Sequence, residues 1–268
     1  MKQFQELENY MLNSNVTEKF SRWAIGYSGC DGGDIGSPES PSIWVCGIEW
    51  GGGGSKEWLE KELESNAGDP GWGYNDPQEN LAYIFNRQTM KLLCAIDGGN
   101  VDEYESFALS KKPFVESERG YYKMNLYPLS FKNTDHNLWG EYFSELTGFY
   151  SKNDYIQWCK ENRLPFFSEI IRKHKPKLII CFGKTYKGDF ENAFCRGSNE
   201  EHNEIILKRN FSWYQTDSTT VAICPFPVNR YGLNSNKLLQ EFGERIRSIS
   251  KYPPAKPEAL VREPLKAA

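Results

Sequence analysis

Polar and aromatic residues follow directly after four short apolar runs in this chain of 268 residues. Apolar runs that alternate with longer helical patterns indicate an α/β protein with a mainly parallel sheet. Ligands of such proteins bind beyond the carboxyl ends of the strands, so the residues that follow the runs are expected to lie together. Carboxylate, amide, aromatic and glycine residues suit a small pocket that recognises a planar group beside a phosphate backbone. The segments concerned are residues 49–52, 125–127, 183–185 and 225–230.

The elements that must position these residues can be predicted from apolar spacing. Two of the runs, residues 177–182 and 220–224, are nearly continuous in apolar side chains, which is typical of buried strands. Strands are predicted at residues 42–48, 121–126, 177–182 and 220–224, with an added strand or hairpin at 204–207 and 211–214. Helices are predicted at about residues 55–65, 78–96, 152–174, 184–195 and 234–249, and a long loop at 66–76.

The chain length predicts one domain with insertions, since a typical domain has about 150 residues. We expect residues 1–250 to form a single α/β domain with a helical N-terminal extension. Residues 251–268 are rich in proline and have no apolar period, so they are expected to form a flexible tail.

Charge is distributed unevenly, although the net charge of the whole chain is only -4. Residues 1–110 hold 7 Lys+Arg against 18 Asp+Glu, a net charge of -11, whereas residues 111–268 hold 25 against 18, a net charge of +7. Either acidic surface helices happen to lie early in the chain, or the later part presents a basic face to an anionic partner.

Metal sites and membrane segments are not expected. The seven cysteines are odd in number and widely spread, no C-x-x-C pair is present, and the three histidines lie far apart, so the sequence predicts reduced cysteines, no metal and no cofactor. No apolar run reaches the roughly 18 residues of a membrane helix, and the N-terminus lacks the apolar stretch of a signal peptide. The expected location is the cytoplasm.

The run Gly51-Gly52-Gly53-Gly54-Ser55-Lys56 superficially resembles a phosphate-binding P-loop. A Walker motif requires glycine directly before the lysine and serine or threonine after it, whereas here Ser55 precedes Lys56 and Glu57 follows it. The sequence therefore argues against nucleotide triphosphate hydrolysis. The run is interpreted either as a flexible turn or as a backbone contact with a nucleic-acid phosphate.

Four segments in order resemble the motifs of the uracil-DNA glycosylase superfamily, most closely its mismatch-specific and single-strand-selective branches. The resemblance covers roughly residues 40–250. It is carried by Gly47-Ile48-Glu49-Trp50-Gly51, Met124-Asn125-Leu126, Cys181-Phe182-Gly183-Lys184 and Cys224-Pro225-Phe226-Pro227-Val228-Asn229-Arg230.

The resemblance implies a three-layer α/β/α sandwich around a short, mainly parallel four-stranded sheet. It further implies a monomeric DNA-binding enzyme that cleaves the N-glycosidic bond of a base flipped out of DNA, with no metal. Glu49 matches the family residue that positions and activates the attacking water, and a solvated loop acid is the alternative. Asn125 matches the amide that reads the edge of the base, and an asparagine that caps a strand end is the alternative.

The resemblance also implies base-binding residues. Gly51 stands where strict uracil enzymes carry a tyrosine that excludes the thymine methyl group, so the pocket is expected to be permissive. Trp50, Trp72 or Tyr74 is expected to stack on the base. Phe226 replaces a family histidine or asparagine that donates a hydrogen bond to the base, and losing such a donor costs about 2.7–4 kcal/mol of transition-state stabilisation.

Nucleic-acid contacts are expected from residues beside these motifs. Arg230 and Tyr231 fall where the family inserts a wedge into the duplex and contacts phosphate, and an ordinary loop pair is the alternative. The further candidates are Gly52, Gly53, Lys184 and Asn229.

Two other functions compete with glycosylase activity. Phe226 and Trp50 depart from the family pattern, which favours a non-catalytic member of the same fold that binds nucleic acid, a nucleotide or a protein. An unrelated α/β enzyme that acts on a small molecule is the third possibility.

Overall fold

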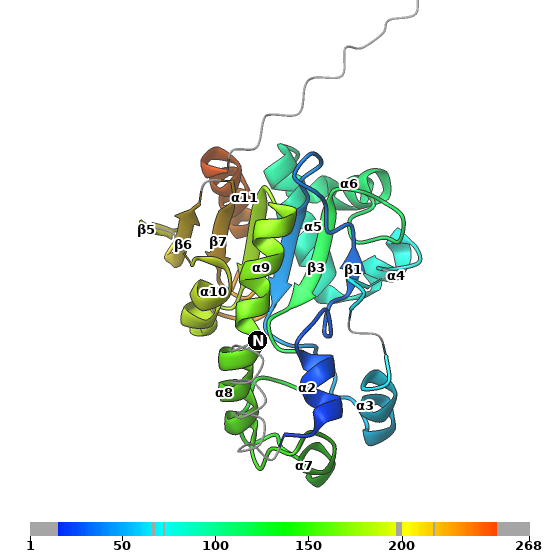
Figure 1. Cartoon of the computed structure of the whole chain (residues 1–268). Coiled ribbons are helices and arrows are strands. Elements are labelled where there is room, and N and C mark those ends of the chain that lie inside the picture. Colours follow the sequence, from blue (N-terminus) through cyan, green and yellow to red (C-terminus); the bar gives the residue numbers. More distant parts are fainter. Residues whose placement is uncertain (1–15, 66–67, 72, 197–199, 217, 251–268) are drawn as a thin grey trace, which may run out of the picture.

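The computed structural model describes residues 16–65, 68–71, 73–196, 200–216 and 218–250. The tail predicted at residues 251–268 and the stacking candidate Trp72 lie outside the described residues, as does most of the predicted N-terminal extension. The chain forms an α/β structure around one mixed sheet of seven strands, in the order β1-β3-β2-β4-β7-β6-β5 (Figure 1).

The centre of the sheet consists of four parallel strands that match the four predicted runs. These are β2 (Ile43–Gly47), β3 (Tyr121–Asn125), β4 (Leu178–Phe182) and β7 (Thr220–Cys224). Every residue of the four strands is buried, which explains why their sequences are rich in apolar side chains.

Three antiparallel strands make the sheet larger than the four strands expected. The strands β5 (Glu201–Ile206) and β6 (Arg209–Gln215) form the hairpin predicted near residues 204–214, and β6 pairs with β7. At the opposite edge, β1 (Gly32–Gly33) pairs with β3. Two glycines provide no alternation of apolar and polar side chains, so this strand left no signal in the sequence.

Two of the predicted helices are each divided in two. Tyr83, with extended backbone, separates α4 from α5, and Arg163 separates α8 from α9. Pro165 has no N–H for a helical hydrogen bond, which favours a new helix at this point. The α-helices are α2 (Glu18–Ala24), α3 (Lys56–Glu62), α4 (Pro77–Ala82), α5 (Ile84–Asp97), α6 (Tyr104–Lys111), α7 (Glu141–Thr147), α8 (Lys152–Asn162), α9 (Leu164–His174), α10 (Lys187–Phe194) and α11 (Asn236–Ile249). Single 3₁₀ turns occur at η1 (Val101–Glu103) and η2 (Lys184–Tyr186).

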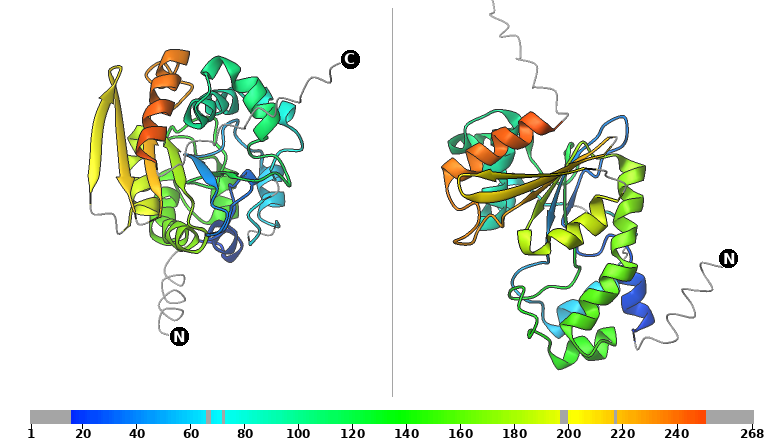
Figure 2. Two further views of the ribbon diagram at one scale, coloured as in Figure 1. Left: turned by 90° about the horizontal axis from the view of Figure 1, so that it is seen from above. Right: turned by 90° about the vertical axis from the view of Figure 1, so that its left-hand side faces the viewer.

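Helices cover both faces of the sheet (Figure 2). Helices α5 and α11 pack together on one face, and α9 and α10 pack together on the other. The crossover from β2 to β3 includes α5 on one face, whereas the connections before and after β4 include α9 and α10 on the other face. Where the connections of neighbouring strands diverge in this way, the position beyond their carboxyl ends is the usual ligand position in open α/β sheets.

Helices α2, α3, α7 and α8 form a separate group beyond one end of the sheet (Figure 1). Lys152, the first residue of α8, contacts Glu49, which follows the end of β2. This helical group therefore lies over the carboxyl ends of the parallel strands, at the edge where the candidate site residues were predicted.

Candidate functional site

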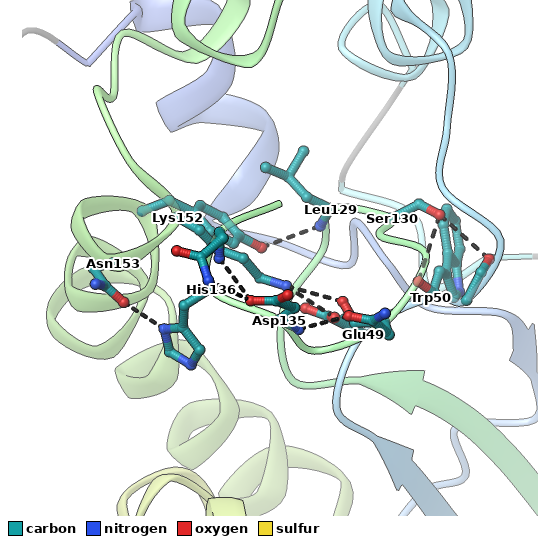
Figure 3. Close-up of polar contacts among 12 residues, drawn as sticks. Glu49, Trp50, Leu129, Ser130, Asp135, His136, Lys152 and Asn153 are labelled. Atoms are coloured by element: carbon teal, nitrogen blue, oxygen red, sulfur yellow. Dashed lines mark hydrogen bonds and ion pairs between the residues drawn. The ribbon is translucent and has the colours of Figure 1, made fainter. Parts of the chain in front are cut away.

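Glu49 forms a buried ion pair with Lys152 just beyond β2 (Figure 3). The Lys152 Nζ atom lies 3.0 Å from Glu49 Oε1, and the side chains are only 0% and 4% exposed respectively. The predicted alternative for Glu49, a solvated loop acid, is therefore wrong. Its carboxylate lies in the interior, just beyond the carboxyl end of β2.

Lys152 is held in place by further contacts. Its ammonium group lies 3.7 Å from the centre of the Phe131 ring and donates a hydrogen bond to the Asn133 carbonyl oxygen at 3.3 Å. The Ser151 side chain caps α8 by accepting a hydrogen bond from the backbone N–H of Asp154, which fixes where the helix begins. The lysine is therefore directed inward from a capped helix start.

The electrostatics of the pair bring its carboxyl group into the neutral pH range. Burial raises the pKa of Glu49 to about 7, although Lys152 and, more weakly, His136 act to lower it. Burial also lowers the pKa of Lys152, and Glu49 offsets that effect only in part. A carboxyl group with a pKa near 7 can accept and release a proton at physiological pH, which a general base must do.

Asn125 ends β3 beside the end of β2, where it is paired in register with Gly47. Its amide Nδ2 donates a hydrogen bond to the Gly29 carbonyl oxygen at 3.1 Å, and the residue is 5% exposed. A Cβ atom on Gly47 would overlap the Asn125 side-chain oxygen, so glycine permits this close approach. The amide thus makes a contact at the strand end, as expected for an asparagine that caps a strand, which is the alternative to reading a base.

Arg163 fixes the backbone around Asn125. The guanidinium group is fully buried and donates hydrogen bonds to the carbonyl oxygens of Leu126, Ala24 and Gly26 at 2.9, 2.6 and 3.0 Å. It also donates to both oxygens of Ser28. One side chain therefore ties residues 24–28 to the end of β3.

A second polar cluster surrounds Lys123 in β3. Its Nζ atom lies 3.0 Å from Asp31 Oδ2 and donates to the Tyr74 hydroxyl oxygen at 2.9 Å, and its side chain is 10% exposed. The same hydroxyl oxygen accepts a hydrogen bond from Asn86 Nδ2 at 3.0 Å. The Phe85 ring centre lies 5.5 Å from Lys123 Nζ. Tyr74 is therefore anchored by two donors within this cluster.

Phe226 belongs to an aromatic group that borders the Lys123 cluster. Its ring centre lies 5.7 Å from that of Phe85, which lies 5.5 Å from that of Phe182 at the end of β4. Phe226 is thus linked to Tyr74 through Phe85 and Lys123. Glu49 lies instead with Lys152, so the predicted site residues fall into two groups.

The glycine run forms an open loop next to residues 130–132. The backbone N–H of Phe131 donates to the Trp50 carbonyl oxygen at 3.0 Å, while the Trp50 ring packs against Trp58. Gly51 and Gly52 are exposed, and nothing lies within 4 Å of a Cβ atom placed on either. Gly53 has a φ of 71°. The loop therefore exposes the backbone of Gly51 and Gly52 just after β2.

The loop after β7 presents the predicted wedge residues to solvent. Tyr231 is 76% exposed, and the guanidinium carbon of the exposed Arg230 lies 5.8 Å from its ring centre. Asn229 Oδ1 accepts a hydrogen bond from the Tyr231 N–H at 3.1 Å, and Arg209 Nε donates to the carbonyl oxygen of residue 232 at 3.1 Å. Lys184, at the start of η2, is half-buried.

Sequence analysis missed both buried lysines, Lys152 and Lys123. Lys152 stands among polar residues typical of an exposed helix start, so nothing in the sequence indicates its burial. Lys123 did leave a signal, because it interrupts an apolar run between Tyr122 and Met124. Charged residues are rarely buried without a partner, so a lysine inside a predicted strand indicates a nearby acceptor.

The sequence matches no protein-family model and no curated protein. Among the described residues, no three His, Cys, Asp or Glu side chains are grouped to hold a metal ion. Within the same part of the chain, no helix has the length and apolar character needed to cross a membrane. A hollow of about 490 Å³ lies between α2 and α9, and its lining includes Tyr27, Phe166 and Lys173 but none of the predicted site residues.

Proposed function

We propose that this protein is a uracil-DNA glycosylase-like enzyme that hydrolyses the N-glycosidic bond of a deaminated or mismatched base flipped out of DNA. The observation that carries the proposal is the buried Glu49–Lys152 pair beyond the carboxyl end of β2, which pairs with β4. A carboxyl group with a pKa of about 7 at this position is suited to water activation. The reaction itself is proposed from the four ordered segments that resemble uracil-DNA glycosylase motifs.

Glu49 performs the proton transfer in the proposed reaction. A water oxygen bonds to the anomeric carbon of the sugar while the bond from that carbon to the base nitrogen breaks. The electron pair of the broken bond leaves with the base, and the proton lost by the water passes to the Glu49 carboxylate. The same negative charge stabilises the cationic sugar as the bond breaks.

Two exposed loops support a nucleic acid as the substrate. Gly51 and Gly52 are exposed in the loop after β2, with nothing within 4 Å of a Cβ atom placed on either, and backbone N–H groups of such a loop can contact phosphate. Arg230 and Tyr231 extend from the loop after β7, so the cation and the ring are available to phosphate and bases. We place the substrate strand across these two loops.

The proposal is tested by Glu49→Gln, which keeps the size of the side chain and removes its charge. Wild-type protein is expected to generate abasic sites in at least one of three duplexes, containing uracil, a mismatch or another deaminated base. Glu49→Gln is expected to lower the single-turnover rate about 10²- to 10⁴-fold, the usual contribution of a general base. Glu57→Gln, which removes an exposed acid on α3, is the matched control. No abasic product on any duplex would refute the enzymatic proposal.

Binding without catalysis is the second candidate function, and Asn125 favours it. The amide N–H that would read a base is engaged with the Gly29 carbonyl oxygen, and the Glu49 side chain is 4% exposed. DNA affinity that falls steeply with salt, without any abasic product, would support this function, because phosphate contacts release counterions. Arg230→Gln should then reduce both the affinity and its salt dependence.

A further inference from the structure

We infer that Lys152 is a positioning residue, whose ammonium group favours the charged form of the Glu49 carboxylate and fixes its orientation at the end of β2. This inference rests on the proposed function, because it concerns the group that activates water there. Lys152 itself is not expected to touch the substrate. Its effect passes through the 3.0 Å contact with Glu49 Oε1.

The geometry gives Lys152 little freedom to move away from Glu49. Its ammonium group is shared among Glu49 Oε1, the Asn133 carbonyl oxygen and the face of the Phe131 ring. Both charged side chains are buried, so solvent and salt screen their attraction much less than they screen surface pairs. The lysine therefore both orients the carboxylate and favours its charged form.

A purely structural role explains this pair less well. A buried ion pair contributes little net stability, because desolvation of both charges offsets their attraction, and apolar residues of similar size often serve as well. Here the pair stands beyond the carboxyl end of β2, on the side of the sheet where α/β proteins normally bind their ligands. The position of the pair thus suits a chemical role, which can be tested by replacing Lys152.

Other ionisable groups facing the pair come from three further segments. His136 favours the charged form of Glu49, and Asp135 favours the charged form of Lys152. Glu49 in turn raises the pKa of two neighbouring tyrosines, although burial is the largest cause in both. These facing groups are His136 and Asp135 before α7, Tyr155 on α8 and Tyr186 on η2. Lys152 is the one that directly hydrogen-bonds the carboxylate.

The first experiment follows the Glu49 carboxyl carbon by NMR titration and needs no substrate. In Lys152→Met, the carboxylate loses its charged partner and stays buried, so its pKa should rise by about 1–3 pH units. Lys152→Gln removes the charge but keeps a hydrogen-bond donor, and it serves if Lys152→Met folds poorly. Lys152→Arg should restore a value close to that of the wild type. Lys160→Met, on the same helix and paired with Asp189 at 2.8 Å, is the matched control.

The second experiment measures the single-turnover rate of base release against pH. Glu49 must be ionised to accept a proton, so the rate rises with pH through its pKa. In Lys152→Gln, this rise should move to higher pH by the same amount as the NMR titration. The maximal single-turnover rate should be more affected than the DNA concentration that gives half of it. A purely structural role would lower the rate equally at all pH values.

The outcomes separate the inference from the proposed function. An unchanged Glu49 titration in both Lys152→Met and Lys152→Gln would overturn the inference, whether or not the protein releases a base. A shifted titration with a shifted rate profile would support it. A shifted titration without abasic product from the wild type would refute the proposed function and the catalytic role of Lys152 with it.

Discussion

Two lysine–carboxylate pairs lie against the central sheet, one at Lys123 in the middle of β3 and one at Glu49 after β2, and they differ in how firmly they hold their charge. In each pair the Nζ atom lies 3.0 Å from a carboxylate oxygen. Burial lowers the pKa of Lys123, but Asp31 and Tyr74 together outweigh that effect and raise it above its ordinary value. Burial also lowers the pKa of Lys152, and Glu49 does not restore it.

The number and strength of partners explain the difference. Lys123 has a carboxylate and a hydroxyl oxygen as acceptors, and two aromatic rings lie within 5.5 Å. Lys152 has the carboxylate of Glu49, one carbonyl oxygen at 3.3 Å and one ring. Lys123 is therefore suited to hold the fold together. The Glu49–Lys152 pair exchanges a proton more readily and is suited to chemistry.

The largest expected difference is in the cost of removing each lysine. Lys123→Met should lower the free energy of unfolding at pH 7 by about 3–5 kcal/mol, because it leaves the half-buried Asp31 carboxylate without its ion-pair partner. Lys152→Met should cost less, because Glu49 can take up a proton. Chemical denaturation measures both. Lys56→Met, which removes an exposed lysine, should leave stability unchanged. Equal costs for Lys123→Met and Lys152→Met would contradict the comparison.

The pH dependence of stability should also distinguish the pairs. The pKa of Glu49 rises from 4.5 to about 7 on folding, so its contribution is complete below pH 4.5 and is lost as pH rises toward 7. The free energy of unfolding of the wild type, measured relative to Glu49→Gln, should fall by on the order of 3 kcal/mol across this interval. Lys123 has a raised pKa, so its contribution is complete below pH 10.5 and constant there. A difference that does not vary with pH would show that burial does not perturb Glu49.

The smallest expected effect concerns the extra acceptor of Lys123. Tyr74→Phe removes the hydroxyl oxygen that accepts from Lys123 and Asn86, and should cost about 1.5–3 kcal/mol, since a hydrogen bond to a charged group is lost. Thermal and chemical unfolding measure this loss. The matched control is Tyr231→Phe, which removes a hydroxyl from an exposed side chain. If Tyr74→Phe were as stable as the wild type, Asp31 alone would account for the charge of Lys123.

Much of the fold was predictable because it depends on local patterns. The four parallel strands and α11 were predicted from the spacing of their apolar residues, and the structure shows Ser235 as the N-cap of α11. The division of the long helices was not predicted. Tyr83 and Arg163 are ordinary residues whose backbone conformation depends on what they contact, and Arg163 contacts carbonyl groups far away in the sequence.

The sequence by itself determined the four parallel strands and the hairpin, and that Glu49 and Asn125 stand at the ends of two of these strands. Apolar runs and the residues that directly follow them contain this information within short segments of the sequence. Only the tertiary structure decided that Lys152 lies against Glu49, that Asn125 bonds Gly29, and that Phe226 approaches Tyr74 through Phe85 and Lys123. Partners such as Glu49 and Lys152, which are 103 residues apart, meet only when the chain packs, and burial then shifts the pKa of the groups it encloses.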